Sequence, residues 1–164
     1  LLACSTTPAS SMAAPAATAT LHPLLVRLVQ QTAAAVLGPD TFDAWAGQPG
    51  AAMVGFAEDP DRSKETLDMA VIVPELHASH SGEFRVALLP PDAARALAPR
   101  YAFARWPAFV MLRDGRYVGA VDGIRDWDVY VAELDRLLAA EPTRPPTVGI
   151  PVIAAGASAS PNCP

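Results

Sequence analysis

Residues 105–123 read RWPAFVMLRDGRYVGAVDG, and they carry the strongest structural pattern in the chain. Two strand-like runs, residues 108–112 and 116–121, flank Asp114-Gly115, a dipeptide that favours the two-residue turn of a β-hairpin. Apolar residues then recur at helical spacing between Trp127 and Leu138, and Asp126 stands where it can cap the start of a helix. The stretch therefore predicts a β-hairpin followed by an amphipathic helix.

Upstream of this hairpin, helical and strand-like patterns alternate. Strands are expected at residues 52–57 and 84–89, and helices at residues 42–45, capped by Asp40 or Thr41, and 92–100. A further helix begins at Pro23, but periodicity alone leaves open whether it runs on to residue 37 or yields to a short strand at 33–37. Residues 67–76 are equally open, because a β-branched run typical of strands follows a helix-favouring segment. The alternation as a whole indicates an α/β protein.

Composition limits the classes of function. The chain has 164 residues, with 17 acidic against 12 basic side chains and one lysine, Lys64, so it offers no basic stripe for nucleic acid. No apolar run approaches the roughly 20 residues of a membrane-spanning helix. Residues 21–140 form the expected folded domain. Residues 1–20, rich in Ala, Ser, Thr and Pro, are expected to be a disordered extension, and 141–164 a flexible Pro/Ala-rich tail.

The order of the elements resembles the thioredoxin-like fold, a central mixed β-sheet flanked by helices. Residues 84–88 resemble its third strand, and Trp106-Pro107 stands where thioredoxins place a cis-proline. Pro74 matches the proline that kinks their long second helix. The resemblance thus implies a helix over 63–79, a first strand near 33–37, and a cis peptide bond before Pro107.

The redox motif of thioredoxins is replaced in this sequence. Their CxxC falls just after the strand at 52–57, where this chain has Asp59-Pro60-Asp61-Arg62. Its two cysteines, Cys4 and Cys163, cannot form a CxxC pair, a zinc knuckle or a disulfide framework. Attack on a disulfide requires a thiolate, so carboxylates at this position predict a fold without a CxxC redox site.

Several separated motifs resemble one narrower family. They lie at residues 42–50, 56–60, 65–76, 105–107, 112–117 and 125–127. The family is HyaE/HupG/HoxO, thioredoxin-like accessory proteins of NiFe-hydrogenase maturation that lack the redox cysteines. The resemblance implies a cytoplasmic, non-enzymatic chaperone without a cofactor. Its partner is expected to be the twin-arginine signal peptide of the hydrogenase small-subunit precursor, held before export, with other maturation proteins as further partners.

The sequence is also compatible with two other functions. One is a generic thioredoxin-like adaptor with another partner. The other is a divergent thiol–disulfide oxidoreductase that borrows a cysteine from its partner. The absence of cysteine between residues 5 and 162 favours the non-enzymatic reading over the second.

The candidate peptide site combines an acidic rim with an apolar wall. Its residues are Glu58, Asp59, Asp61, Glu65 and Asp68, with Trp106 and Pro107 beside them. Carboxylates bind guanidinium groups through bidentate hydrogen bonds, and Trp106 with Phe56 is expected to receive the apolar part of a signal segment. The backbone groups of residues 105–106 are expected to face the same groove. The alternative reading is that these acids only solvate a helix N-terminus and interact favourably with its dipole.

Catalytic and metal sites are not expected. His77 and His80 have a spacing that can chelate a metal, but no third ligand accompanies them, and a solvated helix end explains both. Glu65 and Asp68 resemble an acid–base pair, yet no nucleophile or second histidine is near them in the sequence.

Overall fold

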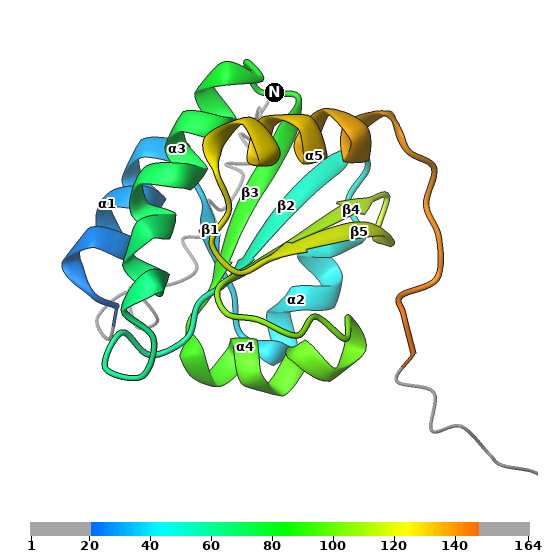
Figure 1. Ribbon diagram of the computed structural model, residues 1–164. Helices are drawn as coiled ribbons and strands as arrows, with labels where there is room; N and C mark the ends of the chain where they lie inside the picture. The colour runs from blue at the N-terminus through cyan, green and yellow to red at the C-terminus, as the bar shows by residue number, and fades with distance from the viewer. Residues whose placement is uncertain (1–20, 148–164) are drawn as a thin grey trace, which may run out of the picture.

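The computed structural model describes residues 21–147 of the chain (Figure 1). Its α-helices are α1 (Pro23–Thr32), α2 (Pro39–Ala46), α3 (Met69–Ser79), α4 (Pro91–Leu97) and α5 (Trp127–Ala139). Its strands are β1 (Ala35–Val36), β2 (Ala51–Phe56), β3 (Phe84–Leu89), β4 (Ala108–Arg113) and β5 (Arg116–Asp122). Two 3-10 turns, η1 (Lys64–Asp68) and η2 (Ala98–Arg100), precede α3 and follow α4. Within the described residues, no helix is both long enough and apolar enough to span a lipid bilayer.

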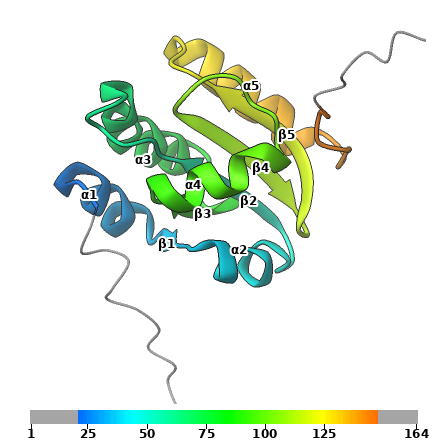
Figure 2. The same cartoon turned by 90° about the horizontal axis from the view of Figure 1, so that it is seen from below.

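The five strands form one mixed sheet in the order β1-β3-β2-β4-β5. Strand β3 pairs in parallel with β1 and β2, whereas β4 pairs antiparallel with β2 and β5. Helices α1, α3 and α5 cover one face, and α2 and α4 cover the other, which is turned toward the viewer in Figure 2. The predicted α/β architecture, a mixed sheet flanked by helices, is therefore confirmed.

The predicted β-hairpin joins β4 to β5. Asp114 and Gly115 have φ angles of 52° and 79°, the left-handed values that a tight two-residue turn of this kind requires. The Asp114 carboxylate accepts a hydrogen bond of 2.7 Å from the N–H of Gly50. The hairpin tip is thereby tied to the start of β2, its neighbour in the sheet.

Tertiary packing decides the two segments that periodicity left open. Helix α1 ends at Thr32 because Ala33 adopts a left-handed conformation (φ 51°), and β1 then pairs with β3. Residues 64–79 are helical, as η1 and α3, with Pro74 inside the helix. Met69, Val73 and Leu76 fall on one buried face of α3, a spacing that a strand could not bury on one side. The β-branched run therefore belongs to a helix.

Two expected helix caps differ from the structure. The N-cap of α2 is Gly38, and Pro39 occupies the first turn, where its missing N–H costs no hydrogen bond. Asp40 therefore lies inside α2 and does not cap it, while the Thr41 hydroxyl oxygen accepts a hydrogen bond of 2.9 Å from the N–H of Gly38. Asp126 does hold the N-cap position of α5, but its side chain makes no capping hydrogen bond.

Candidate functional site

A groove opens where the loops after β2, before β4 and after β5 meet. Its volume is about 770 Å³. The lining residues are Glu58, Arg62, Ser63, Glu65, Arg105, Trp106, Gly123 and Ile124. Two of the predicted acids, Glu58 and Glu65, and the predicted Trp106 thus line one groove, together with the two arginines Arg62 and Arg105.

The loop before β4 supplies the apolar wall. The Trp106–Pro107 peptide bond is cis, as the thioredoxin resemblance implies. Pro107 is buried at the base of this loop, whereas Trp106 is half-buried and packs edge-on against Phe103 with ring centroids 5.0 Å apart. The prediction that Phe56 shares this wall is wrong. Phe56 is 0% exposed and packs into the core against Tyr101 and Phe103.

Asp122, at the end of β5, holds this loop in place. Its carboxylate accepts hydrogen bonds from the backbone N–H groups of Ala104 (2.8 Å) and Arg105 (3.1 Å), and it pairs with Arg125 at 3.1 Å. Burial acts to raise the pKa of Asp122, but these hydrogen bonds and the guanidinium charge outweigh it and lower the pKa. Sequence reasoning missed Asp122, although its place between the strand and Gly123 is a signal of a turn-forming aspartate.

Fewer backbone groups than expected are free to form hydrogen bonds with a ligand in the groove. The N–H of Arg105 is already used by Asp122, so the expectation that it is available to a ligand is wrong. The N–H and carbonyl of Trp106 have no hydrogen-bonding partner within residues 21–147. Backbone pairing with an extended ligand is therefore left to the two groups of Trp106 and the carbonyl of Arg105, which also has no partner within residues 21–147.

Glu58 is buried in an ion pair with Arg95, so it is not an exposed residue of an acidic rim. It is 8% exposed, and its carboxylate lies 2.5 Å from the guanidinium of Arg95 in α4. The same carboxylate accepts the N–H of Asp59 at 2.8 Å, and the Glu58 N–H donates to the Thr66 hydroxyl at 3.2 Å. Glu58 therefore fastens the loop after β2 to α4 and η1, and it shares the Arg95 guanidinium with Asp92, which lies 2.7 Å from it.

The remaining acids are dispersed. Asp59 accepts the N–H of Asp61 at 2.9 Å and so shapes the loop, and neither residue lines the groove. Asp68 is exposed at the junction of η1 and α3, also outside the lining. Glu65 lines the groove and is exposed. The pKa of its carboxyl is lowered by its backbone N–H and by the Ser63 hydroxyl, which donates at 2.9 Å.

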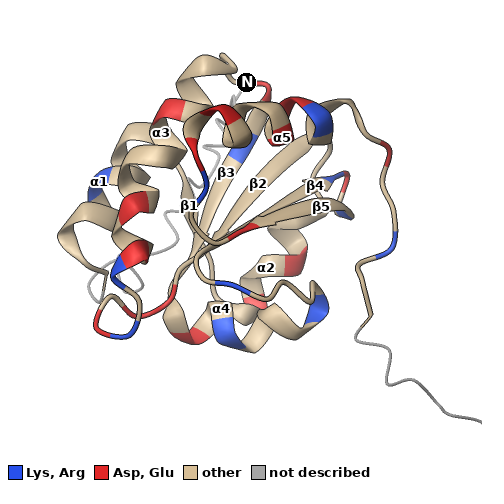
Figure 3. Ribbon diagram, in the orientation of Figure 1, with Lys and Arg blue, Asp and Glu red and all other residues tan. Residues whose placement is uncertain are grey.

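The charge of the groove is mixed. Figure 3 shows acidic and basic residues interspersed along the loop between β2 and α3. Once Glu58 is paired with Arg95, the lining charges without an ion-pair partner within residues 21–147 are those of Glu65, Arg62 and Arg105. The predicted acidic rim therefore overestimates the negative charge of this site.

The two histidines do not face one ligand. His77 packs edge-on against Phe84, with ring centroids 5.4 Å apart. The His80 ring bridges α3 and α5, since its Nε2 lies 2.9 Å from Asp135 and its Nδ1 lies 2.9 Å from the Leu76 carbonyl. Across the described part of the chain, no three His, Cys, Asp or Glu side chains are grouped so as to hold a metal.

Comparison with known proteins identifies the family. The sequence model of "Hydrogenase-1 expression protein HyaE" matches residues 24–130. The "Hydrogenase expression/formation protein HoxO" of Cupriavidus necator is 41% identical over 140 residues, covering 84% of this chain and 87% of the relative. The protein of that name from Azotobacter vinelandii is 34% identical over 143 residues, covering 87% of this chain and 94% of the relative. "Hydrogenase expression/formation protein HupG" of Rhodobacter capsulatus is 32% identical over 121 residues, covering 73% and 88%. The chain therefore belongs to the HyaE family of hydrogenase expression proteins.

Proposed function

We propose that this chain is an accessory protein of hydrogenase maturation, a non-catalytic chaperone that acts in the cytoplasm without a cofactor. Two relatives named hydrogenase expression/formation proteins support the role, because each covers more than four fifths of this chain. The mixed sheet and the loop before Pro107 support a thioredoxin-like fold adapted to binding, and residues 59–62 carry no cysteine.

The proposed ligand is the twin-arginine signal peptide of the hydrogenase small-subunit precursor. The observation that carries this proposal is the unpaired backbone of Trp106 in an open groove, since an extended peptide needs such groups to hydrogen-bond. The indole of Trp106 and the side chain of Ile124, which is 43% exposed, offer apolar contact to the hydrophobic part of a signal segment.

Charge contributes less to this proposal than the apolar contact does. Glu65 is the lining carboxylate without a basic partner in the described chain, so it is suited to receive a guanidinium of the peptide. Arg62 and Arg105 line the same groove and would repel a second guanidinium near them. We therefore expect Trp106 to contribute more affinity than Glu65.

Isothermal titration tests the proposal with the full chain and a synthetic signal peptide of the small-subunit precursor. Trp106→Ala should weaken binding by about tenfold or more, the loss typical of a buried aromatic anchor. Trp127→Ala is the matched control, because Trp127 is 45% exposed at the start of α5 and does not line the groove. Equal affinity of wild type and Trp106→Ala would contradict the proposed site, and absence of binding by wild type would contradict the proposed ligand.

A further inference from the structure

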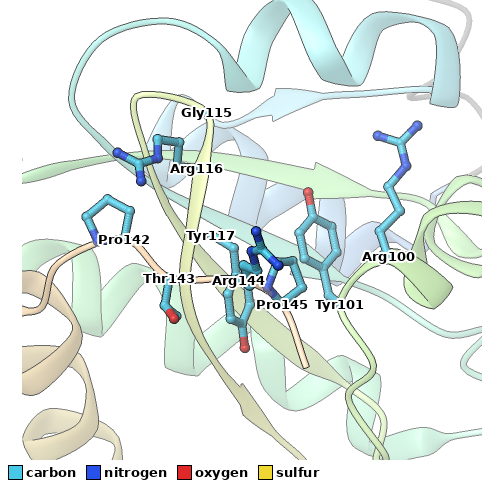
Figure 4. Close-up of a pocket in the computed structure, with 9 residues that line it drawn as sticks. All are labelled: Arg100, Tyr101, Gly115, Arg116, Tyr117, Pro142, Thr143, Arg144 and Pro145. Atoms are coloured by element: carbon cyan, nitrogen blue, oxygen red, sulfur yellow. The ribbon is translucent and has the colours of Figure 1, made fainter. Parts of the chain in front are cut away.

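A second pocket lies on the face of the sheet covered by α2 and α4, and it shares no lining residue with the groove beside Pro107. We call it the arginine pocket. Its volume is about 610 Å³, and its lining includes Arg100, Tyr101, Arg116, Tyr117, Thr143 and Arg144 (Figure 4). They come from three separate segments, which are the turn after α4, the β-hairpin and the segment that follows α5.

The segment after α5 is fixed against the sheet. The Arg113 guanidinium donates hydrogen bonds to the carbonyls of Leu138 and Ala140 at the end of α5. The N–H of Thr143 donates to the carbonyl of Tyr117 at 2.7 Å. Residues 142–145 are thereby held beside β5, and Arg144 is carried to the same pocket as Tyr101, as Figure 4 shows.

The charge of the arginine pocket is positive and not neutralised by the protein. Arg100 is paired with Asp43 at 2.7 Å, but neither Arg116 nor Arg144 has an ion-pair partner within residues 21–147. All 17 acidic residues of the sequence lie in that part of the chain, since residues 1–20 and 148–164 contain neither Asp nor Glu. No acidic side chain outside the described residues is therefore available to pair with the two guanidinium groups.

Aromatic rings supply the wall between these charges. Tyr101 and Tyr117 stack with ring centroids 5.8 Å apart and an interplanar angle of 23°. Both rings line the pocket, together with prolines of the segment after α5. Tyr101 is buried and Tyr117 is half-buried, so the rings add a limited apolar surface beside the free guanidinium groups, which suits a ligand that is mainly anionic and apolar in part.

We propose that the arginine pocket binds an acidic peptide segment of a partner protein, with carboxylates held by Arg116 and Arg144. Guanidinium groups bind carboxylates in a bidentate geometry. Both arginines are exposed, and a single exposed ion pair contributes little affinity, so a ligand with several carboxylates on one chain is favoured over one small anion. A helix N-terminus in the lining would favour a compact phosphate. The residues that line this pocket include none.

Fluorescence anisotropy with the full chain tests this proposal. The probe is a labelled peptide in which glutamates alternate with serine and glycine, and the comparison probe has glutamine in place of each glutamate. We expect the glutamate peptide alone to bind, with affinity falling as salt is raised. The double variant Arg116→Gln/Arg144→Gln should lose about tenfold or more in affinity, since it removes both free charges. Arg27→Gln, an exposed arginine of α1 outside the pocket, is the matched control and should change nothing.

Three results would overturn the proposal. They are equal binding of the glutamine peptide, unchanged affinity of the double variant, and full displacement of the peptide by inorganic phosphate at constant ionic strength. Amide chemical shifts of Gly115 and Thr143 in the wild-type chain give an independent readout, because both residues line the pocket. Binding that leaves these two amides unmoved would place the peptide elsewhere. None of these results depends on whether the groove beside Pro107 binds a signal peptide.

Discussion

Asp122 shows how one side chain sets the shape of the candidate groove. One carboxylate oxygen faces two backbone N–H groups and the other faces the Arg125 guanidinium, so every neighbour of this carboxylate is a donor. Asp122→Asn places an amide NH₂ against donors in either orientation. We expect it to lower the free energy of unfolding by about 1–3 kcal/mol and to weaken signal-peptide binding, because the loop carrying Trp106 loses its attachment.

Urea unfolding measures the change in stability, and isothermal titration measures the change in peptide binding. The control is Asp128→Asn, at an exposed position of α5. Unchanged stability would show that the loop is held by other contacts.

A substitution of Glu65 tests how much the carboxylate in the groove contributes to peptide binding. Glu65→Gln should weaken binding of the signal peptide by a few-fold only, and it should reduce the salt dependence of binding, because one exposed carboxylate is removed. Glu75→Gln on α3 carries the same change of charge outside the groove and serves as control. Titrations at low and high salt measure both properties. If Glu65→Gln and Glu75→Gln behave alike, the acid acts only through the overall charge.

At the scale of elements, His80 links α3 to α5. Burial lowers the pKa of its ring, but the hydrogen bonds to Asp135 and the Leu76 carbonyl and the Asp135 charge outweigh it, so the pKa is raised. A raised pKa means that the stabilisation is complete below the unfolded value of about 6.5 and is lost as pH rises through the folded value. His80→Gln should therefore remove part of the stability measured at about pH 5.5 and little at about pH 8.5.

Urea unfolding at these two pH values checks the prediction. His77→Gln is the matched control, because His77 packs against Phe84 and makes no ion pair with an acid in the described chain. The same loss of stability at both pH values would indicate that His80 acts through packing alone. The side chain of His80 is 9% exposed, so packing is the natural competing cause.

The elements also show what a sequence can and cannot predict. The hairpin and α5 were predictable because Asp114-Gly115 and the spacing of the apolar residues from 127 to 138 act locally. Residues 33–37 and 64–79 were not decided by local pattern, since their structure depends on pairing with β3 and on packing of α3 against the core. The site was predicted less well, because Glu58 is buried in an ion pair with a residue of α4 and the arginine pocket is assembled from three distant segments. Such pairings are made by the fold and leave no trace in spacing.

At the level of the whole molecule, the positions of the two cysteines allow the proposed non-redox role to be tested. Residues 5–162 contain no cysteine, and Cys4 and Cys163 lie outside the described residues. Disulfide exchange proceeds through a thiolate and a mixed disulfide, so a chain that acts by binding should not need either cysteine.

We expect the full chain to give no dithiothreitol-dependent reduction of insulin above a protein-free control. We also expect Cys4→Ser/Cys163→Ser to bind the signal peptide as tightly as wild type. Insulin turnover that disappears in this double variant would show instead that the chain is a divergent oxidoreductase, whereas weaker peptide binding with no turnover would place a thiol in the recognition surface.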